Sequence, residues 1–278
     1  MPPDAAKPKL GLIAGKGELP VLILGAVRAE GRPVFVLAIE GQTAPELVTG
    51  TEHAWIPLGG VGQGIDALKA AGARDVVFAG GVRRPSLLRL GLDARAAKLL
   101  AKVGITALGD DKILSVIIRE LEGEGFRVVG ADALLTELLA GEGVMGRIAP
   151  DDIAHGDIAR ALEIAKALGA LDVGQAVIVQ QGIVLGVEAI EGTDALIARA
   201  GAVAREGPGG VLVKIKKPGQ ERRADLPTVG VGTVESCARS GLRGIAVEAG
   251  ATLVLGRDAV IEAADRAGLF VTGIRVDS

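Results

Sequence analysis

Two hydrophobic periods alternate along the first half of the chain. Short apolar runs, typical of buried strands, are separated by longer stretches with apolar residues three and four positions apart, typical of helices. A regular strand–helix alternation favours a parallel sheet covered by helices on both faces. We therefore expect a Rossmann-like domain, with strands at 10–14, 34–39, 53–58, 75–79 and 126–130 and helices at 18–30, 65–71, 87–103 and 113–122.

The second half mixes the same signals with closer-spaced strands. Two β-runs flank Gly182, which predicts a tight turn between them. Pro150-Asp151-Asp152 opens a long helix through Leu168, and a short Leu-rich helix at 132–139 lies between glycine-rich ends. We expect two domains, 1–133 and 134–278, the second α/β with a mixed sheet. Its strands are predicted at 175–181, 183–191 and 211–215 and another helix at 193–205, and the segments 244–255, 257–267 and 269–276 are expected to supply more strand and helix.

Composition narrows the class of protein. Of 278 residues, 49% are hydrophobic and mean hydropathy is +0.42, yet glycine or charge interrupts every apolar run before the ~18–20 residues that a membrane span needs. The first ten residues lack the apolar core of a signal peptide. The single cysteine, Cys237, fits a reducing cytoplasm. A net charge of −3 and 2% aromatic residues argue against nucleic-acid binding.

A basic segment follows the strand predicted at 211–215. Lys214 and Lys217 precede a break at Pro218-Gly219, and Arg223 and Asp225 follow it. Thr228 and Gly230 then lead into a glycine-rich helix start. Cations, a carboxylate and a helix N-terminus suit a phosphate ester and a divalent ion. The alternative is a solvated basic loop.

Two glycine-rich turns follow strands of the first domain. Gly15, Lys16 and Gly17 lack the spacing of a Walker A loop, and Pro20 takes the third glycine position of a dinucleotide fingerprint. The turn either faces a phosphate or ribose or simply joins strand to helix. Gly80, Gly81 and Arg83 follow the strand 75–79, at the edge of the sheet where such folds bind ligands. Two interpretations of Arg83 stay open: the side chain contacts a phosphate, or it lies on a solvated loop.

Three acidic groups offer hard oxygen ligands. Asp110 and Asp111 precede a helix, where they act as caps or hold Mg²⁺. Glu188 lies among apolar residues. Gly192, Thr193 and Asp194 begin the next helix, as caps or as phosphate, sugar or metal ligands.

Other catalytic arrangements have little support. Only His53 and His155 are present, so neither a Ser/His/Asp triad nor a zinc site is favoured. Cys237 lies in an apolar helical stretch and is interpreted as a core thiol. Acids and cations near glycine-rich helix starts leave metal-assisted attack of water on a phosphoanhydride as the preferred chemistry.

Four motifs in chain order resemble one family. Residues 13–20 (IAGKGELP), 109–111 (GDD) and 186–194 (GVEAIEGTD) are three of them. The fourth consists of Lys214, Lys217-Pro218, Gln220, Arg223 and 225–230 (DLPTVG). Together they are similar to the LpxI-type UDP-2,3-diacylglucosamine diphosphatases of lipid A biosynthesis in Gram-negative bacteria.

The resemblance implies a reaction and a location. It implies hydrolysis of UDP-2,3-diacylglucosamine to UMP and 2,3-diacylglucosamine 1-phosphate, with attack on the lipid-side phosphorus and dependence on Mg²⁺. It also implies a homodimer that works in the cytoplasm, peripheral to the inner membrane. We expect the lipid to bind between or within the domains, chiefly in the second. The basic edge of the helix predicted at 87–103 either contacts that membrane or packs on the core.

Roles follow from residues and resemblance together. We expect Asp225 to orient water or hold metal, and Lys214, Lys217 and Arg223 to contact phosphate. Glu188, Asp110 and Asp111 are further candidate metal ligands. The glycine-rich turns, Arg83 and the residues at 192–194, 228 and 230 are candidate substrate contacts. The alternatives are a non-catalytic nucleotide-sugar or glycolipid sensor and a nucleotidyl- or glycosyltransferase.

Overall fold

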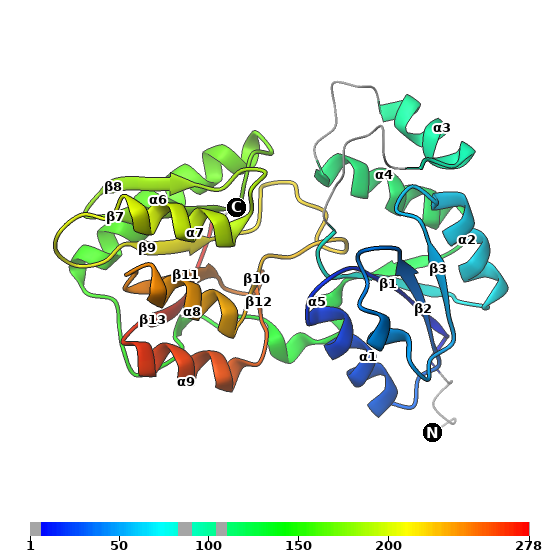
Figure 1. The fold of residues 1–278 in the computed structure, drawn as a ribbon, viewed down its shortest axis with the longest axis horizontal. Helices are drawn as coiled ribbons and strands as arrows, with labels where there is room; N and C mark the ends of the chain where they lie inside the picture. The colour runs from blue at the N-terminus through cyan, green and yellow to red at the C-terminus, as the bar shows by residue number, and fades with distance from the viewer. Residues whose placement is uncertain (1–6, 83–90, 104–109, 278) are drawn as a thin grey trace. The chain divides into compact units, whose positions relative to one another are not determined.

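The chain divides into two compact α/β units (Figure 1). The computed structural model describes residues 7–82, 91–103 and 110–277. The N-terminal unit comprises Met1–Thr136 and Glu221–Asp225, and the C-terminal unit comprises Glu137–Gln220 and Leu226–Ser278. The sequence placed one boundary after residue 133 and did not predict the return of Glu221–Asp225. That return gives the N-terminal unit five residues of the basic segment.

The N-terminal unit is built on a five-stranded sheet in the order β3-β2-β1-β4-β5. All its pairs are parallel, with Leu10 of β1 in register with Val34 on one side and Asp75 on the other. The expected Rossmann-like parallel sheet is confirmed. Its strands are β1 (Leu10–Ala14), β2 (Val34–Ile39), β3 (His53–Ile56), β4 (Asp75–Ala79) and β5 (Arg127–Val129).

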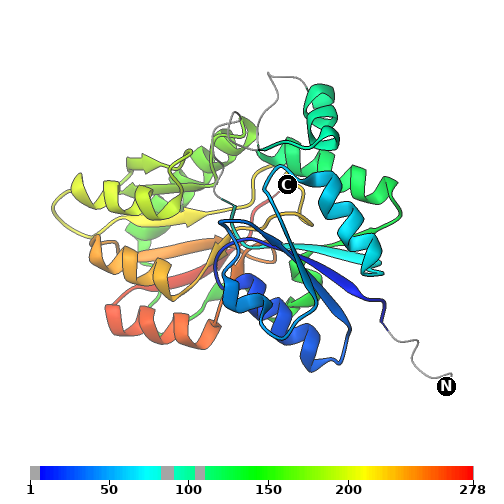
Figure 2. The ribbon, with the colours of Figure 1, turned by 45° about the vertical axis from the view of Figure 1, so that its right-hand side comes forward.

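Helices cover both faces of this sheet (Figures 1 and 2). Alternate strand residues point to opposite faces. Leu37 and Val76 therefore join Ile65 and Ile118 in a cluster under α2 and α4, while α1 contacts the other face of the sheet and α5. The helices are α1 (Leu19–Ala29), α2 (Val61–Ala70), α3 (Ala94–Val103), α4 (Asp110–Gly123) and α5 (Ala131–Leu134), with 3-10 helices at Pro45–Val48 and Thr136–Leu138.

The single helix predicted at 132–139 is wrong. Leu135 adopts a non-helical backbone conformation, with φ −135° and ψ 53°, after the short α5. The chain then makes a separate 3-10 turn at Thr136–Leu138. The apolar spacing therefore predicted helical structure but not the break within it.

An ion triad centred on the buried Asp75 lies at the amino end of the N-terminal sheet. Asp75, 2% exposed, pairs with Arg32 and accepts hydrogen bonds from Nε and Nη2 of Arg127 at 2.8 and 2.6 Å. Burial raises the pKa of Asp75, but the hydrogen bonds and charges of Arg127 and Arg32 outweigh it and hold that pKa below its usual range. The triad ties β4 to β5 and to the residues before β2.

The C-terminal unit contains a six-stranded mixed sheet in the order β6-β13-β11-β9-β7-β8. Strands β9, β11 and β13 are mutually parallel, and β6, β7 and β8 pair antiparallel. This confirms the predicted mixed sheet. The strands are β6 (Gly143–Val144), β7 (Ala176–Gln180), β8 (Ile183–Val187), β9 (Val211–Lys214), β11 (Gly244–Glu248) and β13 (Phe270–Ile274); β10 (Thr228–Val229) pairs separately with β12 (Leu253–Val254).

Both faces of the mixed sheet are filled by side chains. One face packs on α6 through residues such as Val177 and Val213, and the other packs on α7, α8 and α9 through Ile178 and Leu212 (Figure 1). Gln181 and Gly182, both with positive φ, form the predicted tight turn between β7 and β8. The helices are α6 (Asp152–Ala170), α7 (Thr193–Ala202), α8 (Val231–Arg239) and α9 (Arg257–Ala267).

Candidate functional site

An apolar cavity of about 340 Å³ lies in the N-terminal unit, at the carboxyl ends of its strands. Leu37 and Ile65 line it, as do Leu100 of α3 and Ile117 of α4. The strand order reverses between β1 and β4, and open α/β sheets bind ligands at such a crevice. The volume falls in the range of roughly 300–1,000 Å³ typical of small-molecule pockets. The large cavity found here therefore belongs to the first unit, whereas the sequence placed the lipid chiefly in the second domain.

Asp225 lines this cavity. Its backbone N–H donates to the carbonyl of Glu221 at 3.3 Å, closing a turn, and Ala224 packs against the cluster beneath α2 and α4. The residue itself is exposed. The loop thus holds a carboxylate at the edge of an apolar space.

The two glycine-rich turns of the N-terminal unit bond to each other. The N–H of Lys16 donates to the carbonyl of Gly81 at 2.8 Å, and the N–H of Gly81 donates back at 3.1 Å. A Cβ on Gly15 would lie 2.5 Å from the Gly81 oxygen, and one on Gly80, at φ +84°, would lie 2.3 Å from the Lys16 oxygen. The glycines therefore allow backbone to approach backbone. Gly15, Gly80 and Gly81 also line the cavity.

Arg223 is engaged by two carboxylates of its own unit. Its guanidinium donates from Nε and Nη2 to Glu221, both at 2.9 Å, and from Nη1 to Glu122 at 2.5 Å. The hydrogen bonds to Glu221 and then Glu122 raise the pKa of Arg223. The sequence singled out neither acid, although Glu221 lies two positions before Arg223. Arg223 is thus a fixed cation whose charge is balanced by neighbouring acids.

The two candidate lysines lie in the C-terminal unit and are also engaged. Lys214, 7% exposed, donates from Nζ to the carbonyl of Thr228 at 3.0 Å. Lys217 pairs with Asp172 at 2.6 Å, a partner missed from sequence because it follows α6, far along the chain. Lys214 therefore joins β9 to the start of β10, while Lys217 anchors its loop to the end of α6.

Glu188 has two polar partners in its own unit. Its Oε1 accepts from the Thr193 hydroxyl at 2.6 Å, and its Oε2 accepts from the Gln175 N–H at 3.1 Å. The carboxylate is nearly buried, with 6% of the residue exposed. Gly192, at φ +82°, is the N-cap of α7, so Thr193 does not cap this helix with its side chain. These contacts hold the start of α7 to the end of β8.

Two glycine-capped helix starts lie at one edge of the C-terminal unit. Parallel strands β10 and β12 lead through Gly230 and Gly256 into α8 and α9, and neither N-cap supplies a side-chain cap. Helix N-termini present N–H groups and positive dipole ends, which favour an anion. Thr228 and Gly230 thus belong to an edge suited to phosphate.

Family comparison covers both units. Residues 9–138 match the LpxI N-terminal domain, and residues 141–272 match the LpxI C-terminal domain. This chain belongs to the LpxI family. The sequence resemblance is therefore confirmed along nearly the whole chain.

A curated LpxI relative matches over almost its full length. The protein, named UDP-2,3-diacylglucosamine pyrophosphatase LpxI, from Caulobacter vibrioides (strain ATCC 19089 / CIP 103742 / CB 15), is 42% identical over 273 residues, 96% of this chain and 97% of its own. Among solved structures, a Campylobacter jejuni biotin carboxylase complex gives a TM-score of 0.30 at 13% identity, over 71% of this chain and 42% of that one. The biotin carboxylase subunit of a pyruvate carboxylase gives 0.27 at 15%, over 62% and 34%. The chain spans less than half of either, and scores this low carry no argument.

The remaining candidate positions of this LpxI family member are spread over both units. Gly17, at φ +92°, lies just before α1. Asp110 and Asp111 are the first residues of α4, and their side chains lie outside the described part, as does the whole of Arg83. Asp194 lies in the first turn of α7, where its charge adds to burial in raising the pKa of Cys237 to about 12. That thiol is thus a protonated core group, as predicted.

No three-residue metal centre is found among the described side chains. Groups of three or more His, Cys, Asp or Glu residues that could hold an ion are absent there. Mg²⁺ in phosphate-processing sites is commonly bound by one or two carboxylates together with substrate phosphates and water. Asp225, which is exposed and lines the cavity, could supply one such carboxylate oxygen. Within the same described ranges, no helix combines the length and apolarity needed to cross a bilayer.

Proposed function

We propose that this LpxI family member hydrolyses the diphosphate of UDP-2,3-diacylglucosamine to UMP and 2,3-diacylglucosamine 1-phosphate, a step of lipid A biosynthesis. The name of the 42%-identical relative supports the substrate. The observation that carries the proposal is Asp225 at the wall of the apolar cavity. A substrate with a charged diphosphate and fatty chains requires both environments.

Asp225 is proposed as the group that acts on water. The Asp225 carboxylate can accept a hydrogen bond from water and orient that water toward phosphorus. The same carboxylate would supply an oxygen to Mg²⁺. When bound, that ion would offset charge on the phosphate oxygens.

Lys214, Lys217 and Arg223 are proposed as phosphate contacts. Each is held by a partner of its own unit, at Thr228, at Asp172 and at Glu221 with Glu122. Fixed cations lose little side-chain entropy when a phosphate arrives.

We place the acyl chains in the apolar cavity of the N-terminal unit. Its lining is mostly aliphatic, and Gly15, Gly80 and Gly81 form part of the wall near β1 and β4. Peripheral contact with the inner membrane, from the cytoplasmic side, and a homodimer complete the proposal. A diacyl substrate resides in a membrane, and α3 carries Lys98 and Lys102 on its exposed side, which suit an anionic surface.

The test is release of UMP by the pure protein from the acylated UDP-sugar with Mg²⁺. We expect turnover that stops when EDTA is added and resumes with Mg²⁺, and one ¹⁸O atom from labelled water in one of the two products. Tight binding without UMP release would instead identify a sensor. Transfer to an acceptor other than water would identify a transferase. Either result would overturn the proposal.

A further inference from the structure

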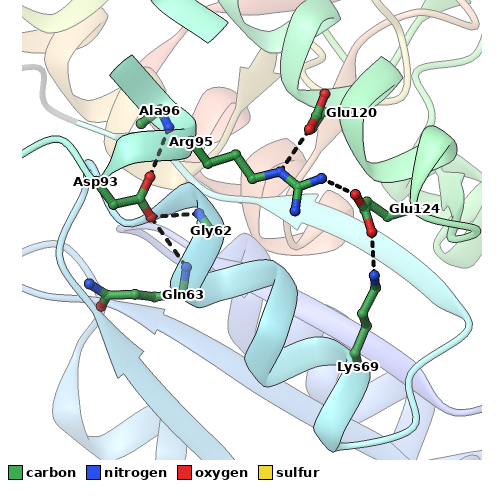
Figure 3. A network of polar contacts seen from close by, with 8 residues as sticks. All are labelled: Gly62, Gln63, Lys69, Asp93, Arg95, Ala96, Glu120 and Glu124. Atoms are coloured by element: carbon green, nitrogen blue, oxygen red, sulfur yellow. Dashed lines mark hydrogen bonds and ion pairs between the residues drawn. The ribbon is translucent and has the colours of Figure 1, made fainter. Parts of the chain in front are cut away.

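Three helices that line the apolar cavity are joined by one polar network (Figure 3). The network connects Asp93, just before α3, to the first turn of α2, and connects Arg95 of α3 to acids of α4. All its members lie in the N-terminal unit. None is among the residues to which the proposed reaction assigns a role.

Asp93 caps two helices with one carboxylate. Its Oδ1 accepts from the N–H of Ala96 at 2.8 Å, in the first turn of α3. Its Oδ2 accepts from the N–H groups of Gly62 and Gln63 at 2.6 and 3.3 Å, in the first turn of α2. Burial raises the pKa of Asp93, but these backbone hydrogen bonds outweigh it, and the carboxyl is ionised at neutral pH. Each oxygen thus serves a different helix.

Arg95 extends the connection to α4. Its Nε donates to Glu120 at 2.7 Å, and its Nη2 donates to Glu124, which also pairs with Lys69 of α2 (Figure 3). Side chains of this network are about a quarter to a half exposed, so each ion pair alone adds little stability. Together they fix the position of α3 against its two neighbours.

The seating of α3 determines the shape of the cavity. Ala96, Leu99 and Leu100 line the cavity from α3, whereas Lys98 and Lys102 are exposed. A helix of ten residues is marginal by itself, so its position depends on its caps and neighbours. A shift of α3 moves three apolar side chains of the wall at once.

We propose that Asp93 is a positioning residue that sets selectivity for the fatty part of the substrate, by holding α3 and α2 at a fixed separation across the cavity. The inference rests on the proposed function. Asp93 touches no reacting atom in this scheme. Its effect is therefore on KM and on chain-length preference, with kcat little changed.

Asp93→Asn separates this role from simple capping. Asparagine is a good N-cap, but it offers one acceptor oxygen, and its amide nitrogen would face an N–H of the second helix. We expect a KM about tenfold higher for the long-chain diacyl substrate, a kcat within about twofold of wild type and a weaker preference for long over short chains. The matched control is Asp151→Asn, which alters the N-cap of α6 in the C-terminal unit.

A second readout does not depend on turnover. Titration with a fluorescent fatty acid should show about tenfold weaker binding to Asp93→Asn and unchanged binding to Asp151→Asn. Hydrogen exchange should accelerate in the first turns of α2 and α3 only in Asp93→Asn. Wild-type KM, chain preference and probe affinity in a folded Asp93→Asn protein would overturn the inference. If even the wild type released no UMP, the proposed function would fail, and the probe affinity would still decide the role of Asp93.

Discussion

The two units differ in how completely side chains fill the space around their sheets. In the C-terminal unit, hydrophobic clusters fill both faces of the mixed sheet, with residues such as Ile178 and Val213 fully buried. In the N-terminal unit, an ion triad around the buried Asp75 lies at the amino end of the sheet, while an apolar cavity lies at the carboxyl end. Unfilled apolar space costs stability, so its retention points to a ligand.

The difference extends to the glycines. Gly15 and Gly80 allow two turns of the N-terminal unit to approach each other, so their place in the wall has a structural cause. Gly230 and Gly256 begin helices in the C-terminal unit, where open N–H groups suit an anion. Glycine-rich motifs that look alike in sequence therefore have different structural roles in the two units. We propose that the fatty part of the substrate binds in the N-terminal unit.

Asp225→Ala should give the largest effect. We expect UMP release to fall by about 10² to 10⁴, because the group proposed to orient water is removed. Thermal unfolding should change little, since Asp225 is exposed. Steady-state kinetics and calorimetry on the same preparation check both statements, and near-normal turnover would remove Asp225 from the mechanism.

Asp75→Asn should destabilise the N-terminal unit and leave the stability of the C-terminal unit unchanged. Loss of the charge leaves the buried Arg32 without its ionic partner, and we expect the N-terminal unit to lose about 3 kcal/mol of unfolding free energy. Hydrogen exchange resolved by peptide should show faster exchange in β4 and β5, with β9 and β11 unchanged. Equal loss of protection in both units would show that they unfold together and contradict this separation.

Asp75 should also make the free energy of unfolding fall at acidic pH. Because the pKa of Asp75 is lowered by folding, its contribution is present above about pH 4 and is lost as pH falls through the folded-state pKa. Denaturant titrations between pH 6 and pH 3 should show a steeper loss for wild type than for Asp75→Asn. Parallel curves would mean that Asp75 is not the responsible group.

Gly80→Ala tests the bridge between the two turns. Its Cβ would clash with the Lys16 carbonyl oxygen at a positive φ, and we expect a loss of roughly 1–3 kcal/mol. Gly81→Ala is the matched control, because an added Cβ there meets nothing within 4 Å. Urea unfolding of both variants measures the contrast, and equal stability of the two would refute the assigned role of Gly80.

Cys237 gives the smallest expected effect. With burial raising its pKa to about 12, the thiol should resist iodoacetamide at pH 8 in the folded protein and react after denaturation. Mass spectrometry before and after unfolding checks this. Rapid labelling of the native chain would show that the core around α8 opens.

Local pattern predicted most of the fold. The bounds of β1, β2 and β4 match the sequence expectation residue for residue, because each has a clear apolar run and a turn signal at its ends. Helix α2 begins at Val61, four residues earlier than expected, in a stretch rich in glycine. Asp93, some thirty positions away, bonds to N–H groups of that first turn, and such a distant cap leaves no local signal.

The candidate site was predicted in composition but not in arrangement. The residue types around Asp225 pointed to phosphate chemistry. That Glu221–Asp225 joins the other unit, and that Glu122 and Asp172 balance Arg223 and Lys217, depends on tertiary contacts between distant positions. Two-residue strands such as β6 and β10 also have no periodicity to detect.

Locating the fatty chains on the protein tests the central claim most directly. A diacyl UDP-sugar with a photoreactive group at the end of one acyl chain, irradiated with Asp225→Ala protein, should label peptides of α2, α3 and α4. Excess unlabelled substrate should abolish that labelling. Labelling confined to peptides of the C-terminal unit would contradict the placement of the lipid beside Asp225.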